Sequence, residues 1–534
     1  MIRMVELFRT LSGYPRLGAL ALGAIAALGF EPIGWWPAAL LALALLIPLI
    51  ANASSAREAC RIGWLFGLGH FIFGNNWIAT AFTYQANMPQ WLGWIAVVLL
   101  AAYLAVYPML AVLGAWLARR NRLAMVLAFA GYWIITEWLR SWVFTGYVWN
   151  PLAMVALGPF DRPGLAALAP FTGTYGLSGI VILLGGLWAA ALWRARADWR
   201  TAAAALAPIL LMLQPGARPD PLPANGLPYT LVQPDIRQDD LDDADKFAGQ
   251  LGKTARLSTP AVSARKSASE ARQARLVLWP ESGMPYYLQE GYPRHLYWTS
   301  SYEADPLMVR GLVGDAIGPD SLLLTGAVDL AFRKGEVDGA RNVITAIAAD
   351  GSLKGSYAKA HLVPYGEYLP LRWLLEPLGA SRLVPGSLDF LPGPGPRTLD
   401  LGAWGKAGMQ ICYEIIFSGQ VVDRRNRPDY IFNPSNDGWF GSFGPPQHLA
   451  QARMRAIEEG LPVLRATTTG ISAVIDGEGI VRQDVPRHVA ARRDGILPAA
   501  LAPTPFARAG NALPLVLSVV LLILSLVAMR RTRR

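Results

Sequence analysis

Charged residues are scarce in this chain. Lys, Arg, Asp and Glu make up 16% of its 534 residues, whereas hydrophobic residues make up 53%. That balance is too apolar for an ordinary soluble protein and indicates a membrane protein. The apolar residues dominate 17–213 and 512–529. We therefore expect a transmembrane bundle over 1–213, an α/β globular domain over 214–511, and a C-terminal transmembrane helix with a basic tail over 512–534.

Cysteine is also scarce, and its two positions are far apart. Cys60 begins an apolar segment, whereas Cys412 lies deep in the globular region, so we expect no disulfide between them. The sequence has no zinc-site spacing, no internal repeat and no low-complexity tract. We predict neither a metal nor a cofactor. The net charge of +10 is not gathered into a basic stripe, which argues against nucleic-acid binding.

The apolar segments predict about eight transmembrane helices. A span of about 20 residues crosses the roughly 30 Å hydrocarbon layer. On that measure the helices are expected near 17–31, 33–51, 62–83, 90–117, 122–140, 175–194, 200–213 and 512–529.

Arginines mark alternate loops of this bundle. They cluster near residues 57–61, 119–122, 194–200 and 530–534, whereas the loops between those, such as 31–37 and 85–90, contain no Lys or Arg. The positive-inside rule then puts both termini in the cytoplasm and 214–511 outside, in the periplasm of a cell with two membranes. The aromatic 141–174 loop lies on the outer side, where we expect it to pack under the globular domain.

The globular region alternates strand and helix patterns. Alternation of this kind indicates a layered α/β domain. Strands are predicted at 227–236, 275–280, 321–330, 342–349, 407–413, 430–434, 462–466 and 472–476. Helices are predicted near 239–274, 299–317, 415–425 and 446–460.

Three of these strand ends stop in short polar signatures. The first exposes Glu281 after Trp279-Pro280, the second carries Lys359 and Glu367, and the third delivers Cys412, followed by Tyr413-Glu414. A thiol with an ordinary pKa near 8.5 needs a base and a positive neighbour to attack a carbonyl at neutral pH. A Glu can take the proton and a Lys can stabilise the oxyanion, so the three types suffice for acyl transfer. A lone Cys on an apolar run is, however, also typical of a buried, inert thiol.

These motifs resemble the nitrilase, or carbon–nitrogen hydrolase, superfamily over most of 228–500. Trp279-Pro-Glu281-Ser, Lys359-Ala-His-Leu-Val-Pro-Tyr-Gly-Glu367 and Cys412-Tyr-Glu414 match its base, lysine and nucleophile motifs. With helices before and after, the whole chain resembles the apolipoprotein N-acyltransferase family of the bacterial inner membrane. The resemblance implies an αββα sandwich. Two departures from the family pattern are the run 233–242, which lacks the usual Trp, and Thr468 in place of Asn.

The resemblance also implies a two-step reaction. Glu281 acts as base while Cys412 attacks a phospholipid ester, with phosphatidylethanolamine the expected donor, and Lys359 stabilises the tetrahedral charge. The thioester then passes its fatty acyl chain to the N-terminal amine of a diacylglyceryl apolipoprotein. Glu367 and Glu414 are expected to orient Lys359, unless they only bind loop backbone, and Tyr413 is expected to shape the pocket.

An apolar segment at 368–378 favours a lipid substrate, because it suits an arm resting in the membrane interface. It could instead cap the domain core. Three alternatives stay open: a membrane-tethered amidase that passes its acyl group to water, a binding or transport protein with an inactive nitrilase domain, and a Cys-His mechanism using His361 or His448.

Overall fold

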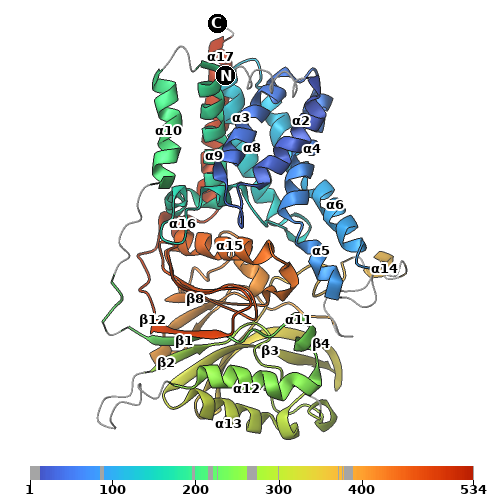
Figure 1. Ribbon diagram of the computed structural model, residues 1–534, viewed down its shortest axis with the longest axis vertical. Coiled ribbons are helices and arrows are strands. Elements are labelled where there is room, and N and C mark those ends of the chain that lie inside the picture. Colours follow the sequence, from blue (N-terminus) through green and yellow to red (C-terminus); the bar gives the residue numbers. More distant parts are fainter. Residues whose placement is uncertain are drawn as a thin grey trace.

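The molecule, a computed structural model, is a helical bundle beside a two-sheet domain (Figure 1). The structure describes residues 13–84, 89–194, 199–213, 221–224, 226–260, 274–298, 300–370, 372–375, 377 and 389–532. The bundle helices are α2 (Pro15–Ala27), α3 (Trp36–Asn52), α4 (Ala56–Gly74), α5 (Ile78–Ala81), α6 (Leu92–Leu104), α7 (Val106–Leu117), α8 (Arg122–Arg140), α9 (Ala169–Arg194), α10 (Trp199–Leu213) and α17 (Ala512–Thr532).

Within the described residues, four helices are long and apolar enough to cross a membrane. They cover Leu92–Leu117, Arg122–Arg140, Leu165–Leu192 and Ala512–Arg531, and shorter apolar helices cover Pro15–Ala27, Trp36–Asn52 and Ala203–Leu213. The prediction of several membrane helices is thus confirmed, but the count of about eight is not. The helix expected at 62–83 ends at Gly74, with Asn75 as its C-cap, and the chain resumes in the short α5.

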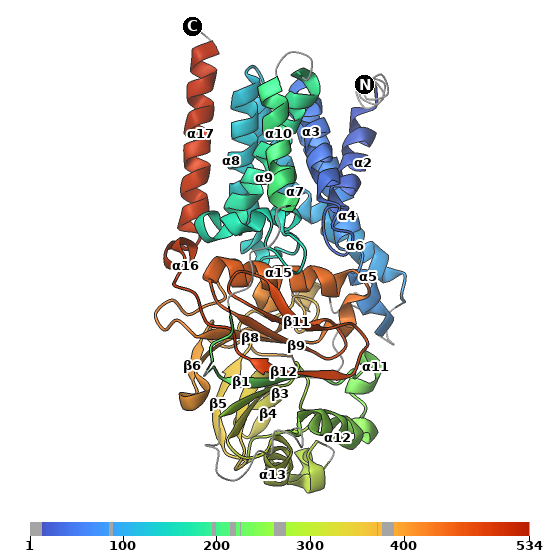
Figure 2. The same cartoon turned by 60° about the vertical axis from the view of Figure 1, so that its left-hand side comes forward.

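The loops before α4 and before α8 lie at the end of the bundle remote from the sheets (Figure 2). Arg16 near the start of α2 pairs with Glu58 near the start of α4, at 2.9 Å. Asn121, which caps α8, donates to the carbonyl of Ala528 near the end of α17. Figure 2 shows α17 running from α16 (Pro505–Ala509), beside the sheet domain, to this far end. The 141–168 loops lie at the opposite end, against the sheet domain.

Two six-stranded sheets form the other part of the molecule. Their strand orders are β12-β1-β2-β3-β4-β5 and β11-β10-β9-β8-β7-β6. The strands are β1 (Pro228–Gln233), β2 (Arg275–Leu278), β3 (Ser321–Arg333), β4 (Glu336–Ala348), β5 (Leu353–Ala358), β6 (Thr398–Asp400), β7 (Lys406–Met409), β8 (Tyr430–Ser435), β9 (Val463–Thr467), β10 (Ser472–Ile475), β11 (Val481–Val485) and β12 (Ala491–Ile496).

Helices cover the outer faces of both sheets, as expected for an αββα sandwich. Leu278 and Leu324 of the first sheet meet Phe432 and Leu464 of the second in the core between them. Helices α12 (Phe247–Ser258) and α13 (Pro306–Ile317) pack on the outside of the first sheet. Helix α15 (Gly444–Glu459) packs on the second sheet and lies between it and the bundle (Figure 1).

Two predicted helices of the domain differ from the structure. The stretch expected over 239–274 is broken into α11 (Gln238–Leu241), a 3-10 turn and α12, which ends at Ser258, and residues 261–273 lie outside the described residues. The expected helix at 415–425 is absent: a single 3-10 turn covers Cys412–Ile416, and bends and turns follow. The apolar residues of this segment are buried although no helix forms. Their spacing therefore resembles the apolar face of a helix without indicating one. The 368–378 segment lies only partly within the described residues. There, α14 (Arg372–Leu375) carries Trp373, which is 76% exposed.

Candidate functional site

The three predicted strand ends converge on one buried cluster. Nζ of Lys359, immediately after β5, lies 3.6 Å from Oε1 of Glu281 and 2.9 Å from Oε1 of Glu367. Cys412, after β7, is close enough for the charges of Glu281 and Lys359 to act on its thiol. All four residues are at most 7% exposed. The structure therefore brings together the residues that the sequence nominated for catalysis.

Glu281 is held on both carboxylate oxygens. Oε1 accepts a hydrogen bond of 2.7 Å from Nδ2 of Asn342, and Oε2 accepts one of 2.8 Å from the backbone N–H of Asn436. Gly326 makes room for this turn, since a Cβ there would lie 2.6 Å from the Cα of Glu281. A carboxylate fixed in this way presents its lone pairs in one orientation, as a proton acceptor needs.

Lys359 is a buried ammonium flanked by two carboxylates. Burial alone would lower its pKa, but the charges of Glu367 and Glu281 more than offset that effect and raise the pKa above its ordinary value. The side chain is therefore a permanent cation at neutral pH. It is suited to stabilise negative charge that develops on a substrate oxygen.

Cys412 sits on a strained backbone turn. Its φ of +49° is a left-handed conformation that non-glycine residues rarely adopt. Its carbonyl is held by Nε2 of His448 at 3.0 Å and by Nδ2 of Asn433 at 3.4 Å. Such strain persists only where the surroundings impose it, and it points to a constraint on where the thiol lies.

The electrostatics require a proton acceptor for this thiol. Burial raises the pKa of Cys412, the charge of Glu281 adds to that rise, and Lys359 opposes it without reversing it. The resting group is thus a neutral thiol. Glu281 is the carboxylate in this cluster that can accept its proton when the sulfur attacks.

Neither histidine fits the role of base. The imidazole of His448 donates through Nε2 to the Cys412 carbonyl rather than facing the thiol, and its Nδ1 lies 3.0 Å from Nη2 of Arg465 and 3.1 Å from Oδ1 of Asp437. Burial and the charge of Arg465 lower the pKa of His448. Burial also lowers the pKa of His361 to about 4, and its ring stacks on Phe417 at 3.8 Å between centroids.

Glu414 binds loop backbone rather than Lys359. Oε1 accepts from the hydroxyl of Tyr357 at 2.8 Å and from the backbone N–H groups of Ala360 and His361, while Oε2 accepts from the N–H of Ile411. Within the described residues no ion pair joins it to the lysine. Of the two roles expected for Glu414, the hydrogen bonds support the binding of loop backbone. This carboxylate connects the loop that carries Lys359 to the turn that carries Cys412.

Tyr413 connects the site to the bundle. Its hydroxyl donates to the carbonyl of Gly146 at 3.2 Å, and its ring lies 6.4 Å from that of Tyr147. Nearby, Nε1 of Trp149 donates to Oε1 of Gln447 on α15 at 2.8 Å. These contacts confirm that the 141–174 loop packs under the globular domain.

Sequence reasoning missed Asn342 altogether. Its Nδ2 donates to Glu281 and, at 3.2 Å, to Glu367, so one amide links the two carboxylates beside the lysine. The only signal was a polar residue at the start of a predicted strand, which is common. The two departures from the family pattern also lie nearby: Gln238, within 233–242, and Thr468 both bind the side chain of Asn436.

Comparisons with known proteins cover the whole chain. The profile of the apolipoprotein N-acyltransferase N-terminal domain matches residues 22–187, and that of carbon-nitrogen hydrolase matches residues 231–489. An apolipoprotein N-acyltransferase of Bradyrhizobium diazoefficiens is 35% identical over 538 residues, covering 97% of this chain and 95% of that protein. Those of Rhodopseudomonas palustris and Caulobacter vibrioides are 34% and 36% identical, over 96% and 86% of this chain and 94% and 84% of those proteins.

Solved structures share only part of the chain. Saccharomyces cerevisiae Nit3, a member of branch 10 of the nitrilase superfamily, is 16% identical, with a TM-score of 0.36, over 52% of this chain and 93% of its own. An amidase from Nesterenkonia sp. is 15% identical, with a TM-score of 0.33, over 53% and 94%. Since the sequence relatives match both the bundle and the sandwich over nearly their full lengths, the chain belongs to the apolipoprotein N-acyltransferase family.

Proposed function

We propose that this protein transfers a fatty acyl chain from a phospholipid to the N-terminal amine of a diacylglyceryl apolipoprotein. Family membership supports the activity. The observation that carries the chemistry is the buried Glu281, Lys359 and Cys412 cluster, whose neighbour Tyr413 contacts the bundle loop at Gly146. The proposal also includes the division at 1–213, 214–511 and 512–534, with both termini cytoplasmic and the catalytic domain in the periplasm.

The first half of the reaction acylates the enzyme. Glu281 takes the proton from Sγ of Cys412 as the sulfur attacks the ester carbonyl, and the oxyanion forms beside Nζ of Lys359. Collapse breaks the ester C–O bond, and Glu281 returns the proton to the leaving lysophospholipid oxygen. A thioester on Cys412 remains.

The second half transfers the acyl chain. The free amine attacks the thioester carbonyl, the second oxyanion forms beside Lys359, and Glu281 takes the amine proton. Collapse breaks the C–S bond, the sulfur recovers that proton, and an amide is released. Glu367 acts as a positioning residue, because it holds the ammonium at 2.9 Å.

Mixing the purified protein with labelled phosphatidylethanolamine, followed by peptide mapping, tests the first half. We expect a labelled thioester on Cys412 that is lost in Cys412→Ser. Adding a diacylated lipopeptide then separates transfer from hydrolysis: N-acylated peptide is expected, whereas free fatty acid as the only product would establish the tethered amidase instead.

A further inference from the structure

The side chain of Asn342 is held by the two carboxylates that flank Lys359. Its amide nitrogen donates a hydrogen bond of 2.7 Å to Oε1 of Glu281 and one of 3.2 Å to Oε1 of Glu367. Carboxylate oxygens beside an ammonium accept hydrogen bonds, so both amide hydrogens must face them and Oδ1 of Asn342 must face away. The orientation of this amide is therefore set by its neighbours.

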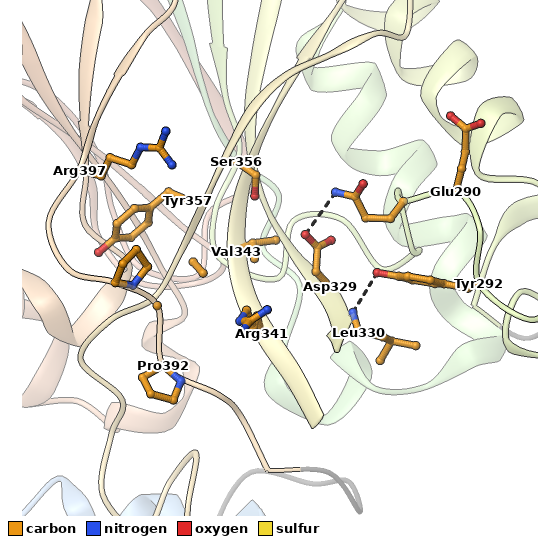
Figure 3. Close-up of a pocket in the computed structure, with 14 residues that line it drawn as sticks. Glu290, Tyr292, Asp329, Leu330, Arg341, Val343, Ser356, Tyr357, Pro392 and Arg397 are labelled. Carbon is orange, nitrogen blue, oxygen red and sulfur yellow. Dashed lines mark hydrogen bonds between the residues drawn. The ribbon is translucent and has the colours of Figure 1, made fainter. Parts of the chain in front are cut away.

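The pairing of β4 fixes the face from which this side chain projects. The neighbours Arg341 and Val343 line a cavity of about 530 Å³ on one face of the strand (Figure 3). Side chains alternate along a strand, so Asn342 points to the opposite face, as does Ile344 in the core between the sheets. The backbone carbonyl of Asn342 also accepts from the N–H of Lys359 at 2.9 Å. The amide thus lies on the inner face of the sheet, beside the reacting groups.

The amide oxygen of Asn342 is free to accept a hydrogen bond. In the part of the chain that the structure describes, no donor reaches Oδ1. The atom is also not sealed from solvent, because Asn342 is only partly buried. The two hydrogen bonds that the nitrogen donates polarise the amide and make its oxygen a better acceptor. A fixed acceptor next to the general base is suited to a nucleophile that carries a second hydrogen.

The two nucleophiles of the proposed reaction differ in the hydrogens that they can offer. When the acceptor amine attacks the thioester, a C–N bond forms and one N–H gives its proton to Glu281, while a second N–H stays on nitrogen in the amide product. When a lysophospholipid attacks in the reverse direction, a C–O bond forms and its only O–H proton goes to Glu281. A second acceptor beside Glu281 therefore stabilises the transition state of the amine and not that of the alcohol.

We propose that Oδ1 of Asn342 accepts the second N–H of the attacking amine, and so favours transfer to an amine over return of the acyl chain to an alcohol. As the C–S bond breaks, the sulfur recovers the proton that Glu281 took. The inference rests on the proposed function and adds a specificity-determining residue to it. Water also carries two hydrogens, so this contact separates an amine from an alcohol and not an amine from water.

The test starts from full-length protein that carries a labelled acyl thioester on Cys412, so that the second half of the reaction is observed alone. This acyl-enzyme is mixed with a diacylated lipopeptide that has a primary amine, or with its N-methylated form, whose single N–H is needed by Glu281. We expect the parent to prefer the primary amine. In Asn342→Leu, which is similar in size but has no acceptor, that preference should fall about tenfold, because the steric cost of the methyl group cancels between the two proteins.

Asn342→Asp is the matched comparison, because it keeps an acceptor oxygen while losing the amide nitrogen. Both variants should form the thioester more slowly, since Glu281 is less firmly held, yet Asn342→Asp should retain the preference of the parent. Should Asn342→Leu not fold, Asn342→Ala removes the same acceptor.

Two outcomes would overturn the inference and leave the transfer reaction intact. One is an equal preference in the parent and in the variants that lack the acceptor. The other is loss of the preference in Asn342→Asp as well, which would trace the effect to the donated hydrogen bonds. If the parent forms no thioester at all, the proposed function fails and this inference fails with it.

Discussion

Removing the charge of Glu367 should change how activity depends on pH. After burial, which opposes it, the charge of Glu367 is the largest influence on the pKa of Lys359. Glu367→Gln keeps the shape and the hydrogen-bonding ability of the side chain. The lysine pKa then falls, because burial continues to lower it while Glu281 remains the main charge that raises it. The variant should lose its ammonium at a lower pH than the parent.

The size of the effect follows from the role of the ammonium. One oxyanion donor is worth about 3–4 kcal/mol in a dry site, or roughly 10²–10³ in rate. The variant keeps the lysine but holds its ammonium less firmly and at a lower pKa, so we expect part of that value to be lost, about 10-fold to 100-fold in thioester formation. That loss should deepen toward alkaline pH, where the parent enzyme stays protonated at Lys359.

The same substitution should also lower stability. A group whose folded pKa is raised stabilises the fold fully below its unfolded pKa, about 10.4 for lysine, so the contribution is complete at neutral pH. Removing one partner of a buried pair typically costs about 3–5 kcal/mol, and Glu281 should keep the loss toward the lower end.

The assay is single-turnover acylation by a fluorescent phospholipid, measured from about pH 6 to about pH 10, a range in which the parent Lys359 stays protonated and a lysine of lowered pKa does not. Glu336→Gln is the matched control, because Glu336 is an exposed carboxylate on the β3–β4 hairpin. Parallel pH profiles for Glu367→Gln and the parent would refute the electrostatic reasoning, even if the absolute rate fell.

Three further outcomes are expected. Cys412→Ser should form no thioester while its free energy of unfolding stays within about 1 kcal/mol of the parent; an adduct elsewhere on the chain would identify another nucleophile. Glu281→Gln should abolish thioester formation, whereas His448→Gln, which still offers a donor to the Cys412 carbonyl, should retain the rate within about tenfold; the reverse result would support a Cys-His mechanism. Tyr357→Phe leaves Glu414 short of one donor and should lower stability by about 1–3 kcal/mol in chemical denaturation, and an unchanged midpoint would contradict that role.

Much of this site could be predicted because catalysis uses strand ends. Runs such as Leu276–Leu278 and the segment before Cys412 are apolar and short, so their ends can be read from the sequence, and the polar residue that follows each run is where a functional side chain is expected. The strands that escaped prediction, among them β5, β11 and β12, are half-buried and carry charged residues such as Arg482 and Arg493. Their pairing is set by neighbouring strands rather than by local pattern.

The residues that hold the reacting groups could not be predicted for the same reason. Asn342 reaches Glu281 across 61 positions of sequence, and Asn436 reaches it across 155. Contacts between residues so far apart in the chain produce no periodic pattern and no characteristic spacing in the sequence. The bundle count is not confirmed for a different reason. Polar residues such as Asn75 end helices early, and hydropathy averaged over a window does not register where backbone hydrogen bonding stops.

The join between sandwich and bundle is built from buried charges, which has a consequence for the reaction. Arg453 on α15, 1% exposed, donates to the carbonyls of Gly158 and Pro159 in the bundle loops, and buried Glu458 accepts from the backbone of Thr174 in α9 at 2.5 Å. Separating the sandwich from the bundle would leave these charged groups without partners, at a cost of several kcal/mol for each charge. The sandwich is therefore fixed on the bundle, and since Tyr413 also binds that bundle, the distance from Cys412 to the apolar helices is fixed as well. An acyl ester must therefore come to the thiol, because the thiol is not free to move to the ester.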